Sequence, residues 1–151
     1  EKGFNNVYFT VATTPNSPQG PLNKIASGGE LARFMLALKV NLAQSSSVAT
    51  MIFDEVDAGV GGATAQAVGE RLARLARDVQ VLVVTHSPQV AACGNNHFKV
   101  EKSTAGNVTT TTVRELTKIE KSEEIARMLA GEVITDAARA AAKVLMKEKS
   151  A

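Results

Sequence analysis

The sequence predicts an α/β fold whose central sheet is mostly parallel and flanked by helices. Segments with apolar residues at every third or fourth position, typical of helices, alternate along the chain with short apolar runs typical of strands. One of these runs, VQVLVVTH, has an unbroken Val/Leu centre, as expected for a strand covered on both faces. The chain has 151 residues, 44% of them hydrophobic, which suits one domain with a real core.

The first third of the chain is predicted to hold two strands and a helix. Residues 7–13 alternate in the manner of a half-buried strand, and three prolines in residues 14–21 indicate a loop. The apolar spacing predicts a helix from about Gly28 to Ala43. The apolar run 48–53 follows as a strand.

The rest of the chain is predicted to continue with helices and strands in turn. Ser87 and Pro88 are typical of the N-cap and first position of a short helix. The other elements expected here are a glycine-rich turn at 58–64, a helix at 63–77, a buried strand at 79–86, two strands at 97–102 and 108–116, and helices at 123–130 and 136–147.

Composition excludes several classes of protein. The formal net charge of +2 is too small to indicate a dedicated nucleic-acid surface by itself. Cys93 is the single cysteine, so no disulfide can form within the chain. No apolar run approaches the roughly 18 residues of a membrane span, and no signal peptide opens the chain.

Two adjacent acids, Asp54 and Glu55, follow the strand predicted at 48–53. Open α/β sheets bind ligands at the carboxyl ends of their strands. In P-loop NTPases an Asp at this position holds Mg²⁺, and a neighbouring Glu can polarise an attacking water. The alternative is that both acids merely begin a solvated loop, and the pair alone does not decide between the two interpretations.

The segment SGGE opens the helix predicted to begin at Gly28. Ser27 and Glu30 have the spacing of a capping box. That box does not require Gly28 and Gly29, each of which costs about 1 kcal/mol relative to Ala inside a helix. Bare amides at a helix N-terminus attract anions, and glycines let a phosphate approach the main chain. We therefore predict an anion-binding site there.

His86 and Asp57 are the remaining candidates. If the strands at 48–53 and 79–85 are neighbours, His86 emerges at the same sheet edge as Glu55. A largely uncharged histidine there could donate a hydrogen bond to a phosphate, although a lone histidine is more often structural. Asp57 precedes the glycine-rich segment 58–62, whose pliability suits close packing against another surface, or simply a loop.

These motifs together resemble a known family. In this order, SGGE, MIFDEVD and VVTHSPQV resemble the signature motif, the Walker B motif with its D-loop, and the switch histidine of an ABC ATPase head. The form SGGE is similar to the SMC branch. Longer stretches, among them FDEVDAGVGGATAQAVGERLARLA, closely resemble the bacterial RecN DNA-repair proteins, from about Val7 to Met146. The resemblance implies the carboxyl-terminal half of an ABC/SMC-type P-loop NTPase head.

The resemblance also implies a role for each candidate residue. Three residues would contact the γ-phosphate of an ATP bound on the opposite head: Ser27, Gly28 and Gly29. Glu30 would help to cap that helix, and Asp57 would lie in the D-loop across the head dimer interface. Asp54 would assist Mg²⁺, Glu55 would be the general base for the hydrolytic water, and His86 would orient the γ-phosphate.

The P-loop pattern G-x-x-x-x-G-K-[ST] is absent from this sequence. The resemblance therefore implies one domain, residues 1–151, that acts as the carboxyl-terminal lobe of a split head and is inactive alone. The partners implied are the amino-terminal P-loop lobe, a second head and DNA, in the bacterial cytoplasm at the nucleoid and not at a membrane. The alternatives are a head lobe of another SMC-like ATPase, which the segment VDAGVGG disfavours, or a non-catalytic interaction module.

Overall fold

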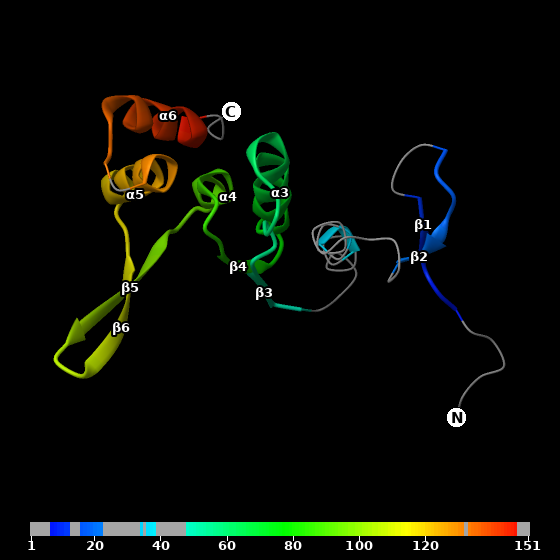
Figure 1. Cartoon of the computed structure of the whole chain (residues 1–151), viewed down its shortest axis with the longest axis horizontal. Coiled ribbons are helices and arrows are strands. Elements are labelled where there is room, and N and C mark those ends of the chain that lie inside the picture. The colour runs from blue at the N-terminus through cyan, green and yellow to red at the C-terminus, as the bar shows by residue number, and fades with distance from the viewer. Residues whose placement is uncertain are drawn as a thin grey trace.

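The computed structural model of this chain describes residues 7–12, 16–22, 34, 36–38, 48–131 and 133–147 (Figure 1). No helix among these residues is long and apolar enough to cross a membrane. The elements, in chain order, are β1 (Thr10–Val11), β2 (Gly20–Pro21), β3 (Thr50–Asp54), α3 (Gly62–Leu75), β4 (Gln80–Val84), α4 (Pro88–Cys93), β5 (Phe98–Ala105), β6 (Val108–Glu115), α5 (Lys118–Ala130) and α6 (Asp136–Lys147).

The helix predicted from Gly28 to Ala43 is described at only four positions, Phe34 and residues 36–38, and all four are helical. The rest of that prediction lies outside the described residues. Of the strand predicted at 7–13, residues 7–12 are described, and among these only Thr10–Val11 pairs, with Gly20–Pro21.

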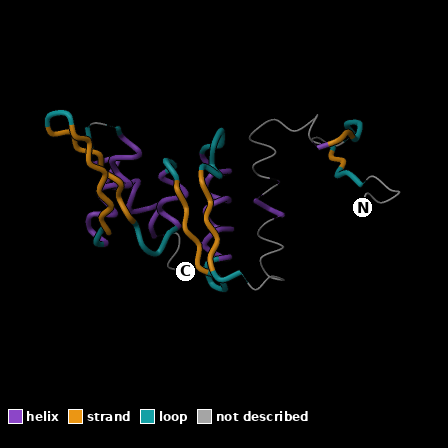
Figure 2. Tube along the Cα trace, turned by 90° about the horizontal axis from the view of Figure 1, so that it is seen from below, coloured by secondary structure: helices purple, strands orange, loops and turns teal. Residues whose placement is uncertain are grey.

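The strands of the described residues form three two-stranded sheets. β3 and β4 pair in parallel, from Thr50 opposite Gln80 to Asp54 opposite Val84. β5 and β6 form an antiparallel hairpin that pairs with no other described strand (Figure 2) and extends away from the helices (Figure 1). The α/β class and a parallel pair therefore agree with the prediction, whereas one mostly parallel central sheet is not found in the described part of the chain.

Helix α3 covers one face of the β3–β4 pair. Alternation along the strands turns Met51, Phe53, Val81 and Val83 toward the helix, where Phe53 is only 2% exposed. From α3, the buried side chains of this core are Ala65, Val68, Leu72 and Leu75.

The opposite face of the β3–β4 pair is open among the described residues. Ile52 is 69% exposed, Leu82 46% and Val84 58%. The prediction that the strand at 79–86 is covered on both faces is therefore wrong for this structure. An unbroken Val/Leu run shows that both faces are apolar, but it does not show that both have a partner.

Helix α4 packs against α3 at a glycine. A Cβ built on Gly69 would lie 2.2 Å from the Cys93 Sγ atom and 3.2 Å from the Val90 Cα atom. Real Cβ atoms do not approach other atoms so closely, and therefore only glycine permits this approach of the two helices.

A second core lies between α4, α5 and α6, and it is made mostly of small side chains: Ala92, Ile125, Ala126, Ala138 and Ala142. Helix α5 begins at Lys118, five residues before the predicted start, because Thr117 and Glu120 form a complete capping box. It ends at Ala130, and its C-cap is Gly131, whose φ of 81° suits glycine. Helix α6 has the predicted bounds.

Candidate functional site

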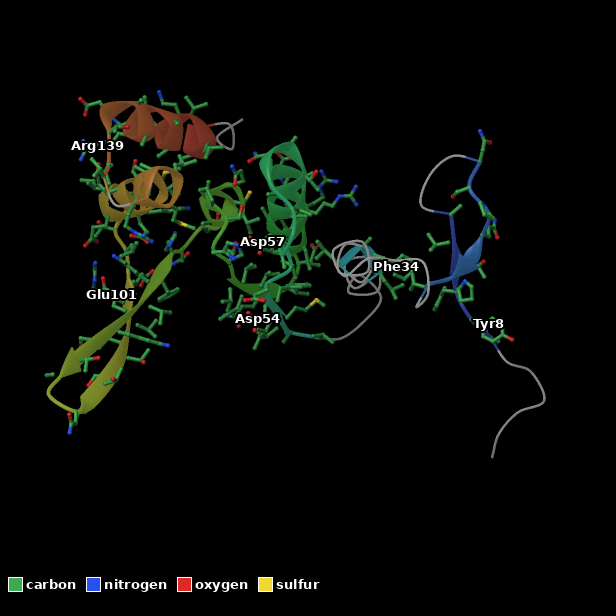
Figure 3. All side chains as sticks on the ribbon, in the orientation of Figure 1. Tyr8, Phe34, Asp54, Asp57, Glu101 and Arg139 are labelled. Carbon is green, nitrogen blue, oxygen red and sulfur yellow. The ribbon has the colours of Figure 1, made fainter. Side chains whose placement is uncertain are left out.

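The parallel pairing brings the ends of β3 and β4 together. The Glu55 backbone N–H donates to the Val84 carbonyl oxygen at 3.2 Å, one position beyond the last strand pair. Asp54 and Glu55 therefore emerge beside Thr85 and His86, at one edge of the sheet, as predicted. The side chains of Asp54, Glu55 and His86 are all exposed, and Figure 3 labels Asp54 at this end of β3.

Glu55 adopts an unusual backbone conformation. Its φ is 50°, in the left-handed region that residues other than glycine rarely enter. A turn holds it there: its N–H is bonded to Val84, and its carbonyl oxygen accepts from the Ala58 N–H at 2.9 Å. Strain of this kind costs about 1–3 kcal/mol and clusters at functional sites.

Asp57 points inward and not toward the exposed edge. It is 1% exposed, and its Oδ2 atom accepts a hydrogen bond from the Thr85 hydroxyl. Its Oδ1 atom is buried without a hydrogen-bond partner among the described residues. The Asp57 carboxylate therefore joins the loop after β3 to the loop after β4.

The glycine-rich segment that follows is open. Gly59 and Gly62 have φ values of 72° and 53°, and no atom lies within 4 Å of a Cβ built on either. Gly61 is the N-cap of α3 and supplies no side-chain cap, and Gly62 is the first residue of the helix. Packing of this segment against another surface stays a prediction, and the open space beside these glycines is compatible with it.

The backbone on both sides of His86 is anchored. The Ser87 N–H donates to the Thr85 hydroxyl oxygen at 2.9 Å, and the buried Ser87 Oγ atom accepts from the Val90 N–H at 3.5 Å as the N-cap of α4. The His86 side chain lies exposed between these anchors.

The structure does not place every predicted site residue. Ser27, Gly28, Gly29 and Glu30 lie outside the described residues. No group of three or more His, Cys, Asp or Glu side chains among the described residues could hold a metal ion. Mg²⁺ in nucleotide sites is usually held by one or two carboxylates together with substrate phosphates. The single exposed carboxylate of Asp54 at a strand end fits that donor set.

Comparison with known proteins gives the relationship. No protein-family model matches the chain. The chain is 46% identical over 144 residues, 95% of its length, to the DNA repair protein RecN of Rickettsia felis. It is 49% identical over 145 residues to RecN of Streptomyces coelicolor and 48% identical over 146 residues to RecN of Xylella fastidiosa. This sequence belongs to the RecN family.

The RecN match covers only part of the relatives. The chain spans 26% of the Rickettsia and Xylella proteins and 25% of the Streptomyces protein, while the matches cover 95–97% of the chain. The chain therefore corresponds to about a quarter of a RecN protein.

A solved structure has a similar fold. It comes from work on ATP-driven dimerization and DNA-stimulated activation of SMC ATPases, and it matches with a TM-score of 0.57 over 78% of this chain and 70% of that chain. At 20% identity the likeness shows the fold alone. It supports an α/β fold of the P-loop type for this RecN segment.

Sequence reasoning missed Thr85, the residue that bonds to Asp57. In the RecN segment VVTHSP this threonine follows a run of valines, and only its polarity at the end of an apolar strand signalled a role. Its partner lies 28 positions earlier, and their contact depends on the strand register.

A second group of charged side chains lies between the hairpin and α5. Lys99 pairs with Glu101 at 3.0 Å and with Glu124 at 3.2 Å, and Arg127 pairs with Glu124 at 2.6 Å. Burial opposes the ionisation of Glu124, but hydrogen bonds from Arg127 and Lys99 outweigh it and lower its pKa. These charges neutralise one another, and they therefore indicate a structural network and not a ligand site.

Proposed function

We propose that this chain, residues 1–151, is the carboxyl-terminal lobe of a RecN-type ATPase head and completes an ATP site where two heads meet. The observation that carries the proposal is the meeting of Asp54, Glu55 and His86 at the carboxyl ends of two parallel strands. Ligands in open α/β sheets bind at this edge. The left-handed backbone at Glu55 adds support, because the fold holds that residue in a conformation with an energetic cost.

Each exposed residue has one task in this proposal. Asp54 would hold Mg²⁺, which when bound neutralises charge on the phosphates. Glu55 would accept a proton from the attacking water as the general base. His86 would donate a hydrogen bond to the γ-phosphate. Ser27, Gly28 and Gly29, with Glu30 as the cap, would present backbone amides to an ATP on the opposite head.

The P-loop would come from another lobe of the same protein. The open face of the β3–β4 pair supports this part of the proposal, because Ile52, Leu82 and Val84 leave a contiguous set of exposed apolar side chains on one side of a sheet. An amino-terminal lobe seated there would cover them and bring the missing phosphate-binding loop to the edge.

The proposal extends to a dimer of heads and to DNA. The structural neighbour comes from work on ATP-driven dimerization and DNA-stimulated activation, and the curated relatives are DNA repair proteins. For this chain we propose ATP-dependent head engagement in double-strand break repair and recombination, in the bacterial cytoplasm. The open loop at Gly59–Gly62, which no atom crowds, is the part of the described chain best suited to meet a second head.

The test is ATP hydrolysis by this chain with and without the amino-terminal lobe. We expect no turnover by the chain alone and turnover when the lobe is added. Glu55→Gln should lower that turnover about 10²–10⁴-fold, because Gln keeps the size and loses the base. ATP binding, measured by titration calorimetry, should persist.

The alternatives predict other results. A non-catalytic interaction module would bind its partner lobe without turnover. A lobe of another SMC-like ATPase would be activated by that protein's amino-terminal lobe and not by one from RecN. Wild-type turnover in Glu55→Gln would remove Glu55 from the catalytic role.

A further inference from the structure

Three anchored points surround the two exposed groups of the site. The last backbone hydrogen bond between the two strands joins Glu55 to Val84. Beyond the strand ends, a side-chain hydrogen bond joins Asp57 to the Thr85 hydroxyl. The same hydroxyl oxygen accepts the Ser87 N–H across His86. Glu55 therefore lies between a backbone link and a side-chain link, and His86 lies between Thr85 and Ser87, which one hydroxyl group joins.

The side chains of Glu55 and His86 have no such support of their own. Both are exposed, and neither makes a hydrogen bond or ion pair with a described residue. Their relative position is consequently set by their backbones, which are joined only through the bonds around them.

We propose that Asp57 and Thr85 form a positioning pair that holds Glu55 in register with His86. The inference rests on the proposed ATPase function, and it assigns to Asp57 a task within its own lobe. The Thr85 hydroxyl donates to Asp57 and accepts from Ser87, so one hydroxyl group links the loop after β3 with both sides of His86.

The burial of Asp57 supports this role over a purely structural one. A carboxylate that is 1% exposed loses its hydration, and only one of its oxygens has a hydrogen-bond partner among the described residues. An apolar side chain would be better suited to packing alone at such a site. A buried polar group whose burial costs free energy, and which joins two loops beside the proposed catalytic residues, is typical of a residue that positions them.

The experiment uses the full-length protein that carries this chain and compares three substitutions. Thr85→Val removes the hydroxyl and keeps the shape, Thr85→Ser keeps the hydroxyl, and Thr64→Val is the matched control on the exposed first turn of α3. The readouts are kcat, the KM for ATP and hydrogen exchange of peptides covering 54–60 and 84–90.

We expect Thr85→Val to lower kcat about 10- to 100-fold with little change in KM, because small displacements of reacting groups cost rates of this order. Exchange should become faster in both peptides, including the one that contains Glu55 and not the mutation. Thr85→Ser keeps the hydroxyl and should therefore have a kcat and hydrogen-exchange rates close to those of the wild type. Thr64→Val should match the wild type in both quantities.

Three results would overturn the inference. They are a wild-type kcat in Thr85→Val, an equal loss in Thr85→Val and Thr85→Ser that follows a fall in melting temperature, and unchanged exchange at 54–60 in Thr85→Val. If the wild-type protein has no ATPase activity, the proposed function fails, while hydrogen exchange still decides whether Thr85 ties the two loops together.

Discussion

The two halves of the described chain use charge in opposite ways. All six ion pairs among the described residues join side chains between positions 99 and 139, in the hairpin, α5 and α6. In the half built from β3, α3 and β4, the side chains of Asp54, Glu55 and His86 have no ion-pair or hydrogen-bond partner among the described residues. In one half the charged side chains pair with one another and stabilise the fold. In the other half these side chains are left available to a ligand.

Backbone strain marks one position of the first half, although Gly59 and Gly62 there take positive φ angles as glycines do elsewhere. The turns of the hairpin and of α5 place glycines, Gly106 and Gly131, at their positive φ angles. At the sheet edge the positive φ falls on Glu55, where glycine would be the easier residue. In the first half, therefore, the residue that the local backbone conformation favours is missing at the position proposed to be catalytic.

The largest expected effect tests this contrast at Glu55. Glu55→Gly should relieve the left-handed backbone and raise stability by about 1 kcal/mol or less, while turnover of the complete protein falls about 10²–10⁴-fold. Glu55→Gln is the control, because it loses the base and keeps the strained backbone. Thermal melts and steady-state ATPase assays measure both quantities, and a loss of stability in Glu55→Gly would contradict the strain.

The next effect concerns the contact between α3 and α4. Gly69→Ala should destabilise the fold by about 1–3 kcal/mol, because its Cβ atom would lie 2.2 Å from the Cys93 Sγ atom. Cys93→Ala removes the sulfur, so Gly69→Ala combined with Cys93→Ala should be more stable than the sum of the single effects predicts. Urea denaturation measures the coupling, and strict additivity would show that the two helices move apart freely.

The third prediction concerns a buried lysine of α5, in the half of the molecule that contains the ion pairs. Lys121, 7% exposed, donates to the carbonyl oxygens of Gly94 and Ala92 at the end of α4. Lys121→Met keeps the chain length and leaves these carbonyls without that donor, and it should cost about 2 kcal/mol. Lys118→Met, on the exposed start of α5, should cost far less.

The same substitution has an electrostatic readout. Burial and the Lys121 charge lower the pKa of His97, while Glu124 raises it. Lys121→Met should therefore move the pKa of His97 upward, as followed by NMR titration. An unchanged pKa of His97 would mean that the charge of Lys121 does not lower it.

The smallest effect lies at the capping box of α5. Hydrogen bonds from the Thr117 backbone and hydroxyl and from Arg114 lower the pKa of Glu120 from 4.5 to about 2. A lowered carboxylate pKa contributes stability that is present above pH 4.5 and is lost as the pH falls toward 2. Glu120→Gln should flatten the fall of melting temperature over that range, whereas Glu70→Gln on α3 should not.

The sequence predicted most of the elements because their signals are local. Ser87 and Pro88 marked the start of α4, and the helix predicted to end at residue 130 does end there. The start of α5 was placed too late, although Thr117 and Glu120 carried the capping signal three residues apart. Local signals of this kind need no knowledge of distant partners.

What the sequence did not reveal depends on contacts between distant segments. The Val/Leu run of β4 did not predict that the side chains of Leu82 and Val84 would be exposed. Whether a strand face is buried depends on another element packing against it and not on the composition of the strand. The shared edge of Glu55 and His86 was predicted from strand order, but the inward turn of Asp57 toward Thr85 follows from the register of β3 and β4.

The spacing of the strand partners also sets an order of folding. β5 and β6 are joined by a short turn at Gly106, and α5 and α6 are neighbours in the chain, so both pairs close small loops. Thr50 must instead find Gln80 across 30 positions, with the whole of α3 between them. Loop closure takes longer as contacts become less local. We therefore expect the hairpin and the α5–α6 pair to form early, and the edge that holds Glu55 and His86 to be assembled last.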